Sequence, residues 1–127
     1  ITILDSQGKE VEKLSTNRSY KVKIEIKKTS QIDILNVNLG IHSIDYQCIV
    51  TGINSLWDEE DINLDKSTIL INLPKISLNE GFFFLSSLVF GATMQEVYDV
   101  MPYALKFEIV TDKVSNIGVV ELEHSWS

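Results

Sequence analysis

Apolar and polar residues alternate along several segments of this chain. In Tyr20–Lys27 every second residue is charged or polar, and the residues between them are apolar. A period of two is typical of a β-strand with one buried and one solvated face. We therefore expect a buried face made of Tyr20, Val22, Ile24 and Ile26.

A second alternating segment, Leu35–His42, differs from the first in the character of its polar positions. Its apolar set is Leu35, Val37, Leu39 and Ile41. Its outward set carries Asn36, Asn38 and His42, with no charged side chain. A face that only needs to be soluble is usually rich in Lys and Glu, so this uncharged face is a candidate binding surface.

The remaining strand signals complete an all-β pattern. Tyr103–Ile109 alternates, and we expect Tyr103, Leu105, Phe107 and Ile109 to point into the core. Phe82–Phe90 is apolar at nearly every position, which predicts a strand covered on both sides or one that meets a partner.

Further strands are predicted at Gln47–Asn54, Ser67–Leu73 and Ile117–Trp126, with turns at Ser6–Lys9, Asp45–Tyr46, Asn79–Gly81 and Asp112–Asn116. Only Thr93–Met101, which Pro102 would end, is compatible with a short helix. Many short strands with almost no helix predict an antiparallel, immunoglobulin-like β-sandwich.

Length and charge restrict the classes of function. The 127 residues fit one domain, 1–127, and the absence of an initiating Met suggests a piece of a longer protein. Eleven basic and 18 acidic residues give a net charge of −7, which disfavours nucleic acid and anionic lipid surfaces as partners. The sequence has no nucleotide-binding loop and no nucleophile elbow, so it gives no reason to expect an enzyme or a cofactor. The lone Cys48 is expected to be a small buried hydrophobe.

One loop combines acidic residues with an exposed aromatic candidate. Asp58–Asp61 is entirely acidic and Asp65 follows, but the spacing and central glycine of a calcium loop are missing. We expect a solvated acidic loop and no metal site, with a cation site as the weaker reading. Trp57, beside the acidic run, is either a core residue or a stacking platform for a flat ligand.

Three segments, taken in order, resemble a known family. Leu78–Leu85 has the form Leu-x-x-Gly-x-Phe-x-Leu, with Phe83 where the family pattern has tyrosine. Asp99 precedes Phe107-x-Ile109, and the chain closes with Gly118-x-Val-x-Leu-x-x-x-Trp126. This order is similar to that of the C-terminal domain of Wzt, the ATP-binding subunit of bacterial ABC transporters that export O-antigen polysaccharide.

The resemblance implies a function that composition and spacing do not. It implies a non-catalytic module that binds O-antigen polysaccharide, by its repeat unit or a terminal modification, and selects it for export. It also implies an ATP-binding domain that this sequence lacks, contact with the transporter membrane subunit through that domain, and a location at the cytoplasmic face of the inner membrane. In this family the domain is a homodimer, to which the C-terminal strand contributes.

We predict that the polysaccharide binds on the outward face of Leu35–His42. The candidate site residues are Asn36, Asn38, His42, Trp57, Phe84, Ser86 and Tyr98. The alternative is a protein-interaction sandwich, such as an adhesion or assembly subunit, that docks a partner on Phe82–Phe90 and on the last strand. A third reading, calcium-dependent surface binding through the Asp58–Asp65 loop, is weaker.

Overall fold

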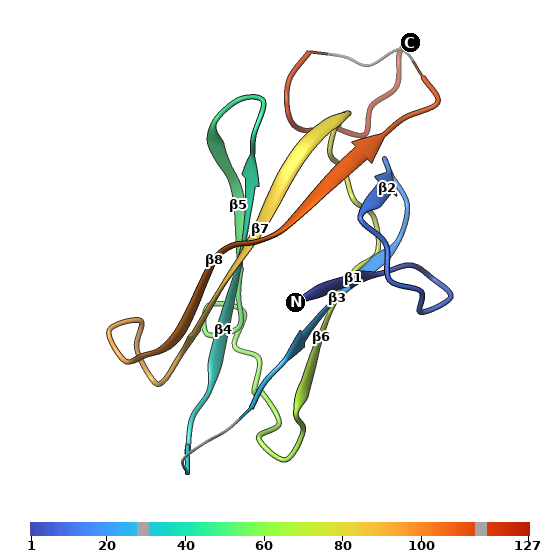
Figure 1. Cartoon of the computed structure of the whole chain (residues 1–127). Coiled ribbons are helices and arrows are strands. Elements are labelled where there is room, and N and C mark those ends of the chain that lie inside the picture. The colour runs from blue at the N-terminus through green and yellow to red at the C-terminus, as the bar shows by residue number, and fades with distance from the viewer. Residues whose placement is uncertain (28–30, 114–116) are drawn as a thin grey trace.

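The computed structural model describes residues 1–27, 31–113 and 117–127, and within them the chain is all-β (Figure 1). Eight strands form: β1 (Thr2–Leu4), β2 (Lys13–Ser15), β3 (Tyr20–Glu25), β4 (Asn36–Ser43), β5 (Cys48–Asn54), β6 (Thr68–Leu73), β7 (Gly81–Phe90) and β8 (Val97–Val110). The predicted antiparallel β-sandwich is confirmed.

The strands form two sheets that face each other (Figure 1). One sheet has three strands in the order β1-β3-β6, and the other has five in the order β2-β8-β7-β4-β5. All pairs are antiparallel except β2 with β8, which run parallel. β7 lies at the centre of the larger sheet: Phe83, Leu85 and Val89 point into the core, whereas Phe82 on its other face is 40% exposed, so within the described chain the strand is covered on one side only.

The core fills the space between the sheets and follows the alternation of the sequence. Tyr20, Val22 and Ile24 point inward from β3, as predicted. Leu35, Val37, Leu39 and Ile41 point inward from β4 and the residue before it, again as predicted. Phe83 of β7 stacks on Phe107 of β8, with ring centroids 5.4 Å apart. The opposite face of the larger sheet is therefore the outer face of the sandwich.

Two expected elements do not form, and one lies partly outside the described residues. Thr93–Met101 is not a helix: a turn occupies its first part, and β8 begins at Val97. Ile117–Trp126 is not a strand, because only Val120 forms a bridge, to Leu78, and the residues after it have no ladder partner among those described. The turn predicted at Asp112–Asn116 includes residues 114–116, which lie outside the described part of the chain.

Candidate functional site

The outer face of the larger sheet brings four of the predicted site residues together. His42 of β4 lies opposite Phe84 of β7, and Gly40 lies opposite Ser86. Asn38 lies two residues before Gly40, so its side chain points to the same face. His42, Phe84, Ser86 and Asn38 are all partly exposed, as a contact surface requires.

Tyr103 completes an aromatic cluster on this face. Its ring centroid lies 5.3 Å from that of His42 and 5.3 Å from that of Phe84. The Tyr103 backbone has φ of 50°, in the left-handed region that few non-glycine residues adopt. The backbone N–H of Tyr103 donates to Oγ of Ser86 over 2.8 Å, so Ser86 holds this conformation in place.

The expectation that Tyr103 points into the core is wrong, because its side chain is 61% exposed. The register between β7 and β8 shifts at a bulge. Leu85 pairs with Leu105, but Ser87, two residues further along β7, pairs with Met101, four residues away from Leu105. This bulge turns Tyr103 outward, whereas Phe107 and Ile109 beyond it remain buried. Pro102 within the strand was the signal in the sequence, since proline inside a sheet marks a bulge or an edge.

A hollow of about 420 Å³ opens beside the aromatic cluster. It is lined by His42, Ser43, Ile44, Gln47, Cys48, Ile49, Phe84 and Tyr103. The lining therefore combines three rings and an amide with aliphatic groups, and it carries no carboxylate or ammonium group. Cys48, expected to be buried, is exposed at this rim because β5 is an edge strand.

Asn36 does not contribute to this surface, although it lies two residues before Asn38 in β4 and so belongs to the same face of the strand. It is 6% exposed, and its amide nitrogen donates to the carbonyl of Gly91 over 2.9 Å. Its amide oxygen accepts from the hydroxyl of Ser55 over 2.9 Å. The expectation that Asn36 is an outward binding group is wrong, because two loops cover it and use both ends of its amide.

Asn38 is connected to the Trp57 loop through a second asparagine that the sequence analysis did not single out. Asn54 is 2% exposed, and its amide nitrogen donates to Oδ1 of Asn38 over 3.3 Å. Its own oxygen accepts the backbone N–H groups of Leu56 at 3.0 Å and Trp57 at 3.4 Å. Trp57 is 70% exposed, so it is a surface aromatic at the end of the sheet where β4 begins.

Tyr98 lies at that same end of the sheet, near the start of β8. It is 46% exposed, and a side chain at Gly91 would meet its hydroxyl. The structure thus places Trp57 and Tyr98 away from the His42 hollow, at the opposite end of β4.

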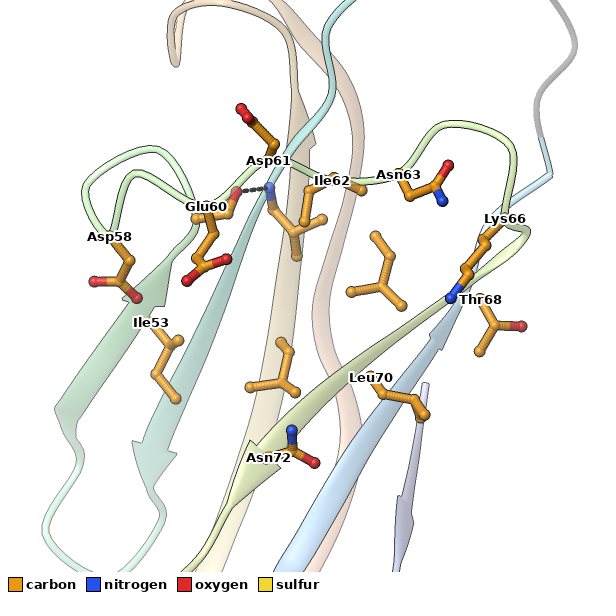
Figure 2. Close-up of a pocket in the computed structure, with 14 residues that line it drawn as sticks. Ile53, Asp58, Glu60, Asp61, Ile62, Asn63, Lys66, Thr68, Leu70 and Asn72 are labelled. Atoms are coloured by element: carbon orange, nitrogen blue, oxygen red, sulfur yellow. Dashed lines mark hydrogen bonds between the residues drawn. The ribbon is translucent and has the colours of Figure 1, made fainter.

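A second cavity, of about 500 Å³, lies where the edge strands β5 and β6 leave the sandwich open. Figure 2 shows Asp58 and Glu60 above Ile53 on the β5 side, with Lys66 and Thr68 on the β6 side. Its floor is the aliphatic margin of the core, and none of the described residues that line it is aromatic. No group of three His, Cys, Asp or Glu side chains in residues 1–27, 31–113 and 117–127 is placed to hold a metal ion, the acidic loop included.

Comparison with known proteins identifies the family. A model of the Wzt C-terminal domain family matches residues 1–122. The chain belongs to the Wzt C-terminal domain family. The crystal structure of the C-terminal domain of Wzt superposes with a TM-score of 0.74 at 18% identity, covering 99% of this chain and 79% of that one. Comparison with curated protein sequences gives no match.

Membership of the Wzt C-terminal domain family supports a polysaccharide-binding role in general and a non-catalytic domain. It also supports an association with an ABC transporter. The described residues contain no helix with the length and apolarity that crossing a membrane requires.

Proposed function

We propose that this domain binds the O-antigen polysaccharide of its host, without catalysis, and selects it for ABC-transporter export. The observation that carries the proposal is the uncharged part of the outer face that β4, β5 and β7 form, with His42, Phe84 and Tyr103 gathered on it. Aromatic rings pack against the apolar face of a sugar, and amides and imidazole pair with its hydroxyls as donors and acceptors.

The charge distribution supports a neutral ligand. The chain carries a net charge of −7, yet the hollow beside Tyr103 is lined by no Asp, Glu, Lys or Arg. Charged side chains begin at the β8 side of the face, where Lys106 lies 5.0 Å over the Phe82 ring and Glu108 pairs with Lys13 at 3.6 Å. A sugar without charged groups can therefore bind here without leaving an unpaired ion buried.

The proposal includes the parent protein that the family implies. An ATP-binding domain elsewhere in that protein would connect this module to the membrane subunit of the transporter, at the cytoplasmic face of the inner membrane. The polysaccharide would reach the module on that face before export.

We test binding by titrating the domain with O-polysaccharide from its own host strain and following amide chemical shifts by NMR. A few neutral hydrogen bonds of ~0.5–1.5 kcal/mol each, together with stacking, predict dissociation constants in roughly the micromolar-to-millimolar range. His42→Ala should weaken binding and leave Tm nearly unchanged, since its side chain is partly exposed. Asn38→Ala should also weaken binding, measured on the folded fraction, but it should lower stability by about 1–3 kcal/mol, because the 2%-exposed Asn54 amide loses the oxygen to which it donates. Asn72→Ala, a change of the same kind at the β5/β6 edge cavity, is the matched control and should bind as wild type. Wild-type affinity in Asn38→Ala and His42→Ala would exclude this face, and a loss in Asn72→Ala would move the site to the edge cavity.

The proposal also includes a homodimer that uses the C-terminal segment. Glu121 N–H donates to the carbonyl of Ser77 over 2.9 Å, but beyond it Leu122 is 73% exposed and Trp126 is 92% exposed. Two large apolar side chains on an extended terminal segment are better explained by contact with a second copy than by contact with water. A chain lacking Glu121–Ser127, or the variant Leu122→Asp with Trp126→Asp, should sediment as a monomer. A monomeric mass for the intact domain at high micromolar concentration would refute the dimer.

A further inference from the structure

The core of the sandwich is incomplete at the edge cavity between β5 and β6. The smaller sheet has three strands and faces a sheet of five, so part of the larger sheet has no counterpart among the described strands. One such part lies at the cavity of about 500 Å³ (Figure 2). Four isoleucines in the cavity wall pack against the core and yet are only partly buried: Ile53, Ile62, Ile69 and Ile71. One more strand beside β6 would cover them.

The free edge of β6 presents backbone groups to this cavity. β6 pairs only with β3 among the described strands, and the N–H of Ile26 donates to the carbonyl of Ser67 over 2.7 Å. Because backbone groups point alternately to the two sides of a strand, those of Ser67, Ile69 and Ile71 face β3, and those of the residues between and after them face away. The residues that face away all line the cavity: Thr68, Leu70 and Asn72. An extended chain laid beside β6 would therefore meet a row of donors and acceptors.

β6 also lacks the usual protection of a sheet edge. Proteins block exposed edges with proline, charged side chains, bulges or a covering element. Thr68–Leu73 contains no proline, no charged residue and no register shift. Leu70, at the centre of the strand, is 50% exposed. These are the features of an edge that binds a peptide by strand addition.

The charge at the cavity favours a basic partner. Asp58, Glu60 and Asp61 line it together with one basic residue, Lys66, and Figure 2 shows Asp58 and Glu60 on the β5 side. The whole chain has a net charge of −7. Lys or Arg side chains on a partner would therefore meet complementary charge at this rim, whereas an acidic segment would be repelled.

We propose that the edge cavity receives an extended segment of a partner protein, which pairs with β6 as a fourth strand of the smaller sheet. The inward side chains of the segment are apolar and cover Ile69 and Ile71, and Lys or Arg at its end lies against the acidic rim. The C-terminal segment of a second copy does not have this chemistry, because Gly118–Trp126 carries Glu121 and Glu123 and neither Lys nor Arg. The inference does not depend on glycan binding, which is placed on the outer face of the other sheet.

Two blocked peptides test the chemistry of the partner. The probe is acetyl-Lys-Val-Thr-Val-Thr-Val-Lys-amide, whose sequence is the same in both directions and has Val at alternate positions; its counterpart has Glu in place of both Lys residues. Binding is followed by NMR amide shifts and hydrogen exchange. The Lys peptide should slow exchange of the Thr68, Leu70 and Asn72 amides, with no comparable change at Ile69 and Ile71, whose N–H groups face β3. The Glu peptide should bind about fivefold more weakly or less tightly still.

Variants of the edge and of the rim have matched controls. Leu70→Pro removes one donor of the free edge, and proline is tolerated on an edge strand where its N–H would face solvent. Leu70→Ala removes the same side chain but keeps the donor, so Leu70→Pro should bind the Lys peptide more weakly than Leu70→Ala by about fivefold, the equivalent of one lost hydrogen bond. Asp58→Asn with Glu60→Gln should also weaken binding. Glu10→Gln with Glu12→Gln removes the same charge beside β1 and β2, away from β6, and should bind as wild type.

The outcomes separate the possible occupants of the cavity. No binding of the Lys peptide, equal affinity for the two peptides, or equal affinity in Leu70→Pro and Leu70→Ala would refute the docking of a basic strand. The alternating exchange pattern in wild type decides the same question without any variant. If the Thr68, Leu70 and Asn72 amides are protected in the free domain and lose protection on dilution, a second copy occupies the edge and the proposal is wrong. It is also wrong if O-polysaccharide, and neither peptide, shifts these amides.

Discussion

Replacing Tyr103 with glycine should separate the stability of the fold from binding of the glycan. The left-handed conformation of Tyr103 costs about 1–2 kcal/mol for a residue with a side chain, and glycine adopts it freely. Glycine adds a flexibility cost of about 0.5–1 kcal/mol in the unfolded chain. The ring loses its contacts with His42 and Phe84, which are worth less than a buried pair of about 0.5–1.5 kcal/mol each because Tyr103 is 61% exposed. These effects largely cancel, so the free energy of unfolding should change by no more than about 1–2 kcal/mol.

Binding of the glycan should respond differently, because the Tyr103 ring belongs to the aromatic cluster with His42 and Phe84 on the proposed binding face. Loss of a stacking platform worth about 0.5–1.5 kcal/mol corresponds to a drop in affinity of roughly two- to thirteenfold. Tyr103→Ala provides the matched comparison: it removes the same ring but keeps the strained backbone, so it should bind as poorly as Tyr103→Gly and unfold more easily. Urea denaturation followed by circular dichroism measures stability, and NMR titration with O-polysaccharide measures affinity. Wild-type affinity in Tyr103→Gly, or destabilisation well beyond 2 kcal/mol, would show that Tyr103 serves the fold instead.

Two further predictions concern the fold beneath this face. Phe107→Asp should leave the domain unfolded, because it removes a 2%-exposed ring stacked on Phe83 and buries an unpaired charge, at a cost of several kcal/mol against a total of ~5–15; a soluble variant with a cooperative melting transition would contradict the core assignment. Asn36→Ala should destabilise the domain by about 1–3 kcal/mol, since it leaves the Gly91 carbonyl and the Ser55 hydroxyl without their partner. Glycan affinity measured on the folded fraction should not change, and a loss as large as that of Asn38→Ala would show that Asn36 reaches the ligand.

The sequence predicted the strands whose partners lie within the sandwich. Period-two alternation is set by which face of a strand is buried, so the inward positions of β3 and β4 follow directly from the printed residues. Tyr103 escaped this rule because it lies inside the bulge, where the extra residues of β8 leave the ladder, whereas Phe107 and Ile109 beyond the bulge keep the predicted face. The segment Ile117–Trp126 has the alternating pattern of a strand. Whether it joins a sheet depends on a neighbouring strand, and the alternation within the segment does not specify one.

As with the fold, the sequence predicted part of the candidate site and missed the rest. The uncharged outward positions of β4 indicated the face on which the proposed site lies, and the pairing of His42 with Phe84 and of Gly40 with Ser86 places the β7 residues on that face. Asn36 and Asn38 look equivalent in sequence, and only the Gly91 and Ser55 contacts separate a structural amide from an accessible one. Asn54 acts through its position in the sheet, because its amide nitrogen donates to Oδ1 of Asn38.

The outer-face site has consequences for selection during export. Neutral hydrogen bonds and stacking on an open sheet give weak binding at each site, since water competes for every hydroxyl. Two sites on one dimer would convert the second contact with the same polysaccharide into an intramolecular event and raise the overall affinity by about 10²–10⁴ where the chain spans both. Selection would then depend on a polymer that is long enough and regular enough to occupy both sites, and the C-terminal segment would set how far apart the two sites are held. Disrupting the dimer through Leu122 and Trp126 should therefore weaken binding of long polysaccharide much more than binding of short fragments.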